Sequence, residues 1–309
     1  MENLYAIQFS EDDDLLDIRY DPVFKAVFTR ETPSSRGAIS SLVSACIKRK
    51  ITVETIVANE PPITDITNRQ IRYDIACKTT TGEKVNIEMS FFPAIWEKER
   101  IEFFAGKLFT EQEIRGTEKS YLDLMETFQI AIICNTEYFK DERLIHRFHY
   151  YDEESTMSYE GKSWIITMEL CKAGQFLEKP ANELEVPECW ALFLEYLTSL
   201  RERSIINEIL KREEGLTMAS EELMRISRDE EERARLTSEL KYLLDMQSYQ
   251  TELKRSEQRV REKEAEIAEK DAKIAQIQIE TARTLKAADV SLDIIAQSTG
   301  LSLEEIEEL

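Results

Sequence analysis

Residues 69–92 carry two acidic side chains, Asp74 and Glu88, on two runs that alternate between apolar and polar residues. Such alternation is typical of β-strands. Residues 80–82 between the runs predict a three-residue hairpin loop with Gly82 in the left-handed conformation. Asp74 then lies directly opposite Glu88, because each is seven residues from the tip at residue 81.

The same register divides the hairpin into an apolar and a polar face. We expect the apolar side chains to point into a core: Tyr73, Ile75, Cys77, Val85, Ile87 and Met89. The polar side chains point the other way: Arg72, Asp74, Lys78, Lys84, Asn86, Glu88 and Ser90. The two carboxylates therefore belong to the polar face.

Opposed carboxylates repel each other, and like charges so placed destabilise a sheet. A divalent cation between them relieves the repulsion. Mg²⁺ for phosphoryl chemistry is held by such an oxygen pair, completed by water and substrate phosphate. The alternative is a solvent-exposed polar face on which Arg72, Lys78 and Lys84 neutralise the acids. The hairpin pattern leaves both interpretations open.

Helix and strand patterns alternate around the hairpin, which predicts a mixed α/β sheet with helices against it. Asp21-Pro22 indicates a helix start, with Asp21 as the N-cap. The other predicted helices are 38–47, 94–113 and 187–200. The predicted strands are 51–58, 71–77, 84–91, 127–134 and 163–170. The resulting order is α-β-β-β-α-β.

The composition changes near residue 205, after which Pro does not occur and Glu, Lys, Arg, Gln and Ala dominate residues 221–282. Apolar residues recur every seven positions: Leu253, Val260, Ile267 and Ile274. The companion positions are mostly polar: Ser256, Lys263, Lys270 and Ile277. This predicts a long helix with a weak coiled-coil stripe, either a solvated extension or a dimer stalk that self-associates weakly.

The predicted organisation has four parts. An acidic N-terminal segment (1–20) precedes an α/β domain (21–205), a long charged helical region (206–284) and a short helical pair (285–309). The helical pair is separated at Thr299-Gly300, and Ser302 with Glu305 predicts a capping box for its second helix.

The charge of the chain excludes a basic nucleic-acid-binding module. Its 309 residues include 40 basic and 61 acidic side chains, a net charge of −21. Residues 1–205 carry −12 (24 against 36) and residues 206–309 carry −9 (16 against 25). Any contact with nucleic acid must therefore use a local patch or a metal ion.

The cysteines favour a cytoplasmic protein with reduced thiols, because five of them are scattered without a C-x-x-C pair: Cys46, Cys77, Cys134, Cys171 and Cys189. The start of the chain has no secretory signal pattern, and no apolar run is long enough to span a membrane. His146 and His149 lack the spacing of zinc ligands, and we expect surface or strand residues there.

Four segments together resemble the recombination-promoting nuclease and putative transposase family of bacteria, within the PD-(D/E)XK nuclease superfamily. They are Asp21-x-x-Phe24-Lys25-x-x-Phe28, Arg72-Tyr73-Asp74-Ile75, Asn86-Ile87-Glu88-Met89, and Thr299-Gly300-Leu301-Ser302 with Glu304-Glu305-Ile306 and Leu309. The resemblance implies a PD-(D/E)XK core, α-β-β-β-α-β, in residues 21–205, with an acid on the second strand and E-x-K on the third.

The chain departs from this pattern at position 90, where Ser90 replaces the Gln of the family or the Lys of the wider superfamily. The following helix carries Arg100, Phe104, Lys107 and Glu111 at spacings that share one face. Lys107 or Arg100 could supply the missing positive charge, and Lys107 is the first choice. The alternative is an ordinary amphipathic helix with its cations in solvent.

The resemblance implies that Asp74, Glu88 and the Met89 backbone carbonyl hold Mg²⁺, or Mn²⁺ in its place. The metal lowers the pKa of a bound water that attacks a DNA phosphodiester. Lys25, Arg72, Arg100 and Lys107 are the candidates that hold the phosphate or stabilise its charge. Asp21 and Ser90 are accessory candidates, with the N-cap as the simpler role for Asp21.

The sequence thus predicts a bacterial, cytoplasmic, metal-dependent DNA endonuclease associated with recombination or transposition. The alternative is a nuclease-like fold that has lost hydrolysis and acts as a DNA-binding or assembly protein. Ser90 and the net charge of −21 favour this alternative, whereas the intact pair of Asp74 and Glu88 favours the enzyme.

Overall fold

The computed structural model describes residues 7–57, 74–91, 93–112, 114 and 120–309. The chain divides into two compact units, residues 1–240 and residues 241–309. Arg72, one of the predicted phosphate contacts, lies outside the described residues, as does Tyr73.

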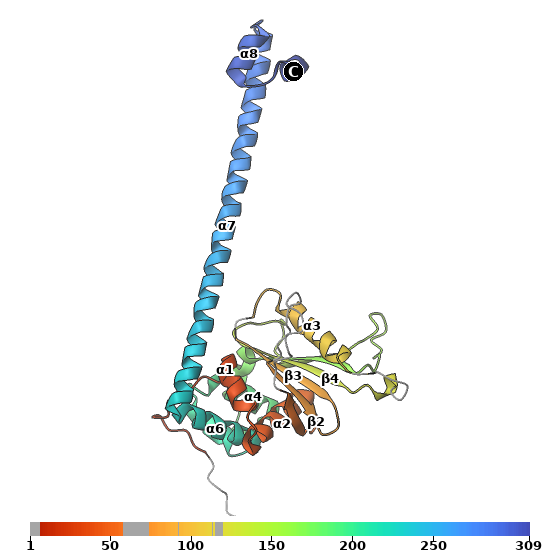
Figure 1. Cartoon of the computed structure of the whole chain (residues 1–309), viewed down its shortest axis with the longest axis vertical. Coiled ribbons are helices and arrows are strands. Elements are labelled where there is room, and N and C mark those ends of the chain that lie inside the picture. The colour runs from red at the N-terminus through yellow and green to blue at the C-terminus, as the bar shows by residue number, and fades with distance from the viewer. Residues whose placement is uncertain (1–6, 58–73, 92, 113, 115–119) are drawn as a thin grey trace, which may run out of the picture. The chain divides into compact units, whose positions relative to one another are not determined.

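Unit 1 contains a six-stranded mixed sheet in the order β1-β2-β3-β4-β6-β5 (Figure 1). Neighbours β1, β2 and β3 are antiparallel, β3, β4 and β6 run parallel, and β5 pairs antiparallel with β6. The strands are β1 (Val53–Val57), β2 (Ile75–Thr79), β3 (Lys84–Ser90), β4 (Thr127–Ile133), β5 (Ile145–Phe148) and β6 (Ser163–Glu169). The predicted mixed α/β class is confirmed.

The β2–β3 hairpin has the predicted register. Ile75 pairs with Ile87 and Cys77 with Val85, while Gly82 has a φ of 97°. The apolar face is buried in the main core, as expected. This register leaves Asp74, the residue before β2, next to Glu88 on β3.

One face of the sheet is covered by helices that share its hydrophobic core. They include α1 (Asp21–Phe28), α2 (Pro33–Ile47) and α4 (Val186–Tyr196). The Thr32 hydroxyl accepts a hydrogen bond from Ser35 N and so caps α2, which therefore begins five residues earlier than predicted. Phe24, Phe28 and Trp190 are fully buried between these helices and the strands.

The opposite face carries α3 (Glu97–Thr110), which Figure 1 shows across the sheet from α2 and α4. Its Ile101 packs on Ala131 and Ile133 of β4, a cluster separate from the main core. Phe104, Ala105 and Leu108 of α3 are buried as well, and the polar side chains Glu88 and Ser90 of β3 contact Arg100 and Glu97 of this helix. This is the face that carries Glu88.

The expected domain boundary at residue 205 falls inside unit 1. It lies within α5 (Arg203–Leu210), and α6 (Glu214–Arg228) follows in the same unit. Leu216, Ala219, Leu223 and Ile226 of α6 are buried in the main core, and α6 packs along α2. The apolar positions of α6 recur at a helical period within a charged segment, so composition alone does not separate it from the long helix that follows.

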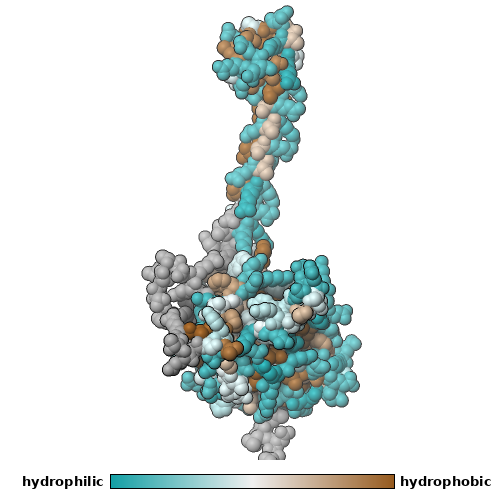
Figure 2. Space-filling model, turned by 90° about the vertical axis from the view of Figure 1, so that its right-hand side faces the viewer, coloured by the Kyte–Doolittle hydropathy of each residue, from teal (hydrophilic) through white to brown (hydrophobic). Residues whose placement is uncertain are grey.

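The long helix α7 (Glu230–Ala287) is continuous over 58 residues. It is separated from α6 at Asp229, whose carboxylate accepts from Glu232 N and so begins a new helix. Val260, Ile267, Ile274 and Ile277 are more than half exposed, and Figure 2 shows hydrophobic side chains along a mainly hydrophilic surface. The side chain of Leu253 lies outside the described set.

Unit 2 ends in α8 (Leu292–Thr299) and α9 (Leu303–Glu308), which enclose a small cluster with Ala282 of α7. Gly300 has a φ of 77° at the end of α8, and Ser302 with Glu305 forms the predicted capping box. Short 3₁₀ helices are found at Tyr121–Asp123, Leu170–Phe176 and Ala181–Glu183. Over the described residues, no helix combines the length and hydropathy needed to cross a membrane.

The position of α6 makes a prediction about truncation. A chain that ends at residue 240 should unfold cooperatively, because it retains every helix of the main core. A chain that ends at residue 205 should aggregate or melt without cooperativity, because loss of α6 exposes the apolar side of α2. Thermal unfolding by circular dichroism, with light scattering, separates the two. A monomeric and cooperative 1–205 fragment would contradict this assignment of α6.

Candidate active site

Asp74 and Glu88 meet at the end of the β2–β3 hairpin. The backbone N–H of Asp74 lies 3.4 Å from Glu88 Oε1, and the backbone N–H of Met89 donates to Asp74 Oδ2 at 3.1 Å. The carboxylates are therefore held by the backbone of the opposite strand. The Met89 side chain points into the core, so its backbone is the part of this residue that belongs to the polar site.

Helix α1 brings a lysine to this pair. Lys25 Nζ lies 3.1 Å from Asp74 Oδ1 and 2.8 Å from Asp21 Oδ2. The expectation that Asp21 caps the helix is wrong: Tyr20 is the N-cap, and Asp21 is the first helical residue. One turn separates Asp21 from Lys25, so its carboxylate pairs with Lys25 and is not available to the helix terminus. Its Oδ1 atom is buried without a hydrogen bond.

Glu88 is almost completely buried, at 1% exposure. Asn86 Nδ2 donates to its Oε1 at 2.9 Å, and Arg100 Nη1 lies 3.2 Å from Oε2. Oε2 is buried and has no hydrogen bond. Asn86 and Ser90 are buried as well, which excludes the solvent-exposed polar face for this end of the hairpin.

Burial raises the pKa of both carboxyl groups in the pair. For Asp74 the nearby Asp21 carboxylate raises the pKa further, and for Glu88 the Asp74 carboxylate does so. Lys25, Arg100 and the hydrogen bonds described above lower these pKa values but do not offset burial. When both carboxyl groups are ionised and no further cation is nearby, the pair therefore destabilises the folded state.

The charge balance of the site fits a divalent cation. Four carboxylates are close to two cations: Asp21, Asp74, Glu88 and Glu97 against Lys25 and Arg100. When all are ionised the site has an excess charge of −2. No group of three or more His, Cys, Asp or Glu within the described ranges forms a metal-ligand cluster. A metal would therefore be held by the Asp74 and Glu88 side chains with a backbone oxygen and water. Glu88 Oε2 accepts no hydrogen bond, and it forms an ion pair with Arg100.

Among the cations of α3, the structure brings Arg100 to the acidic pair and leaves Lys107 away from it. Lys107 is 43% exposed and pairs with Glu111 at 3.5 Å. It lies two turns beyond Arg100, roughly 10 Å along the helix axis. Phe104 is buried, and the Arg100 guanidinium lies 5.5 Å from its ring centre. The first choice of Lys107 as compensating cation is therefore corrected to Arg100.

The sequence reasoning missed Glu97, which is 3% exposed in the first turn of α3. Its Oε1 accepts hydrogen bonds from Ser90 Oγ at 2.9 Å and from Arg100 Nη2 at 2.6 Å. The available signal was its position three residues before Arg100, a spacing at which helical side chains meet.

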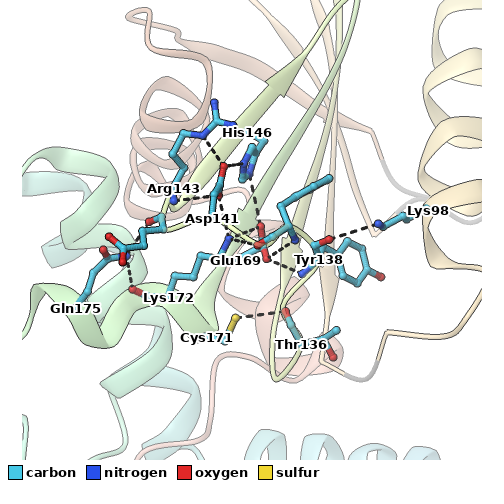
Figure 3. A network of polar contacts seen from close by, with 12 residues as sticks. Lys98, Thr136, Tyr138, Asp141, Arg143, His146, Glu169, Cys171, Lys172 and Gln175 are labelled. Carbon is cyan, nitrogen blue, oxygen red and sulfur yellow. Dashed lines mark hydrogen bonds and ion pairs between the residues drawn. The ribbon is translucent and has the colours of Figure 1, made fainter.

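A second polar network lies at the carboxyl end of the parallel strands, in line with Ser90, and centres on Glu169 of β6 (Figure 3). Its carboxylate accepts from Tyr138 N at 2.7 Å and pairs with Lys172 Nζ at 3.1 Å. His146, a strand residue as expected, lies between Glu169 and Asp141. The Tyr138 ring packs against the Ile101 cluster, so this network holds the loop after β4 against α3.

The family model of the PD-(D/E)XK nuclease family transposases matches residues 18–253. The matched region includes the sheet, α1 to α6 and the acidic pair. The chain belongs to this family. Neither curated proteins nor solved structures gave a match.

The raised pKa of Glu88 predicts how stability depends on pH. A carboxyl group whose pKa is higher in the folded state than in the unfolded state destabilises the fold when it is ionised. The free energy of unfolding should therefore fall as the pH rises from about 4 through the raised pKa. In EDTA at pH 8, Glu88→Gln should raise the free energy of unfolding by about 1–3 kcal/mol. At pH 4 it should change little. Urea unfolding at both pH values measures this.

The matched control is Glu99→Gln, an exposed glutamate of the same helix as Arg100. It should leave the unfolding free energy unchanged at both pH values. Saturating Mg²⁺ should remove the advantage of Glu88→Gln by stabilising the wild type. If the wild type is more stable than Glu88→Gln at pH 8 in EDTA, the ion pair with Arg100 stabilises ionised Glu88 by more than its burial costs.

The Glu169 network predicts a separate stability effect. Glu169→Gln leaves Lys172, which is 7% exposed, without its buried counter-charge. Removing one partner of a buried ion pair costs about 3–5 kcal/mol. The control is Glu137→Gln, which changes an exposed glutamate in the loop after β4. Equal urea midpoints for the two variants would contradict the role of Glu169.

Proposed function

We propose that this protein is a divalent-metal-dependent DNA endonuclease with a PD-(D/E)XK core formed by α1, β1, β2, β3, α3 and β4. The observation that carries the proposal is the largely buried pair of Asp74 and Glu88, with Lys25 against Asp74 and Arg100 against Glu88. Family membership supports nucleic acid as the substrate. Association with recombination or transposition is the finer part of the same proposal.

The roles of the residues follow from their contacts. Asp74, Glu88 and the Met89 carbonyl would hold Mg²⁺ or Mn²⁺, which would supply a bound water of lowered pKa and positive charge for the phosphate. Asn86 and the Met89 N–H fix the two carboxylates in orientation. Lys25 and Arg100 are positioned to contact the phosphate and to stabilise the charge that develops on it.

Local charge accounts for DNA binding by a chain of net charge −21. Because the mean field repels DNA, binding depends on the metal ion and on these few cations, and it should be weak and salt-dependent. We place the protein in the cytoplasm, in keeping with free thiols at Cys46, Cys77, Cys134 and Cys189. The exposed stripe of α7 is proposed to support weak self-association.

The second candidate function is a nuclease-like DNA-binding or assembly protein without hydrolysis. Ser90 favours it, because a serine supplies neither the charge nor the reach of Lys or Gln. The position of Arg100 favours the enzyme, because it places a permanent positive charge against Glu88.

Plasmid nicking with Mg²⁺ or Mn²⁺ tests the proposal. Asp74→Ala and Glu88→Gln should abolish metal-dependent cleavage. Arg100→Ala should lower the rate ~10²–10³-fold, the usual loss for one transition-state charge contact. Lys107→Ala is the matched control, because it removes a cation of the same helix that pairs with Glu111. It should leave the rate unchanged.

Two outcomes would contradict parts of this account. If Lys107→Ala abolishes cleavage and Arg100→Ala does not, the cation assignment is wrong. If the wild type binds DNA but remains inert with both metals, the binding function replaces the enzyme.

A further inference from the structure

Glu97 lies where the third strand and the following helix meet. It is buried, and its Oε1 atom is shared by Ser90 of β3 and Arg100 of α3. The contact joins the two elements on which the proposed site is built. A carboxylate in the first turn of a helix commonly only stabilises the helix terminus. Here it makes two specific side-chain contacts instead.

The guanidinium of Arg100 bridges two carboxylates. Nη2 contacts Glu97 at 2.6 Å and Nη1 contacts Glu88 at 3.2 Å. A planar guanidinium held at two of its nitrogens has a defined orientation, which a single contact to Glu88 would not impose. Glu97 therefore decides where the positive charge of Arg100 lies relative to the Glu88 carboxylate.

Ser90 takes part in the same arrangement. It is 6% exposed, and its hydroxyl donates to the Glu97 oxygen that also accepts from Arg100. A lysine at this position would carry its own positive charge to Glu97 and would compete with Arg100 for it. The serine is thus compatible with an arginine that comes from α3.

We propose that Glu97 is a positioning residue that, together with Ser90, holds the Arg100 guanidinium against Glu88. Helix α3 thereby supplies the positive charge that position 90 lacks. The catalytic part of this inference rests on the proposed nuclease function, whereas the positioning of Arg100 can be measured without it.

A kinetic double-mutant cycle is the first test. Cleavage of a labelled DNA duplex with Mn²⁺ is compared for Glu97→Gln, Arg100→Ala and the double variant. Glu97→Gln should lower kcat about 10- to 100-fold with KM unchanged, a smaller loss than the ~10²–10³-fold expected for Arg100→Ala. The double variant should be no slower than Arg100→Ala, because Glu97 acts through Arg100. Glu99→Gln should match the wild type.

Variants at position 90 test the role of the Ser90 hydroxyl. Ser90→Ala should lower kcat less than Glu97→Gln, because it removes one hydrogen bond and leaves the Glu97–Arg100 pair intact. Ser90→Lys should not raise the wild-type rate. Multiplicative losses in the double variant, or a Glu97→Gln protein as active as the wild type, would overturn the proposal.

The second test does not depend on activity. In ¹⁵N–¹H spectra of arginine side chains, Arg100, assigned with Arg100→Lys, should show slow guanidinium rotation in the wild type and in Glu99→Gln. In Glu97→Gln this restriction should be lost, with thermal unfolding used to confirm that the fold persists. A restricted Arg100 in Glu97→Gln would refute the positioning role. If the wild type is inert but this restriction depends on Glu97, the nuclease function fails and the positioning of Arg100 stands.

Discussion

The structure of the site depends on one unfavourable interaction, the burial of two neighbouring carboxylates, Asp74 and Glu88. Burial raises the pKa of each; the Asp21 carboxylate raises the pKa of Asp74 further, and the Asp74 carboxylate that of Glu88. Such a pair persists only where other groups offset its cost. The Met89 N–H, Asn86, Lys25 and Arg100 do so in part, and the remaining charge matches a divalent cation.

The helices around the sheet position the two cations that compensate this charge. Helix α1 packs through Phe24 and Phe28 into the main core, which fixes Lys25 at Asp74. Helix α3 packs on the other face through the buried side chains of Ile101, Phe104, Ala105 and Leu108, and the Glu169 network holds the loop after β4 beside it. The two cations are therefore held by helices on opposite faces of the sheet, Lys25 by α1 and Arg100 by α3 with its ion pair to Glu97.

This division bears on how the chain departs from its family. Position 90 lies on β3, within the sheet, whereas Arg100 comes from the separate helix α3. A positive charge that comes from such a helix needs a partner to orient it, and the buried Glu97 meets that need. In the proposed arrangement, the serine at position 90 is thus linked to residues seven and ten positions later in the chain.

The sequence by itself determined the hairpin register, the facing of Asp74 and Glu88, the apolar face and the capping of the last helix, because these follow from short-range periodicity and turn geometry. Only the tertiary structure decided which cation reaches Glu88, since Arg100 and Lys107 share a helical stripe but differ in distance from β3. It also decided that Asp21 pairs with Lys25, that Glu97 is buried and that α6 belongs to the core. These outcomes depend on how helices dock on the sheet and on one another, which short-range periodicity does not specify.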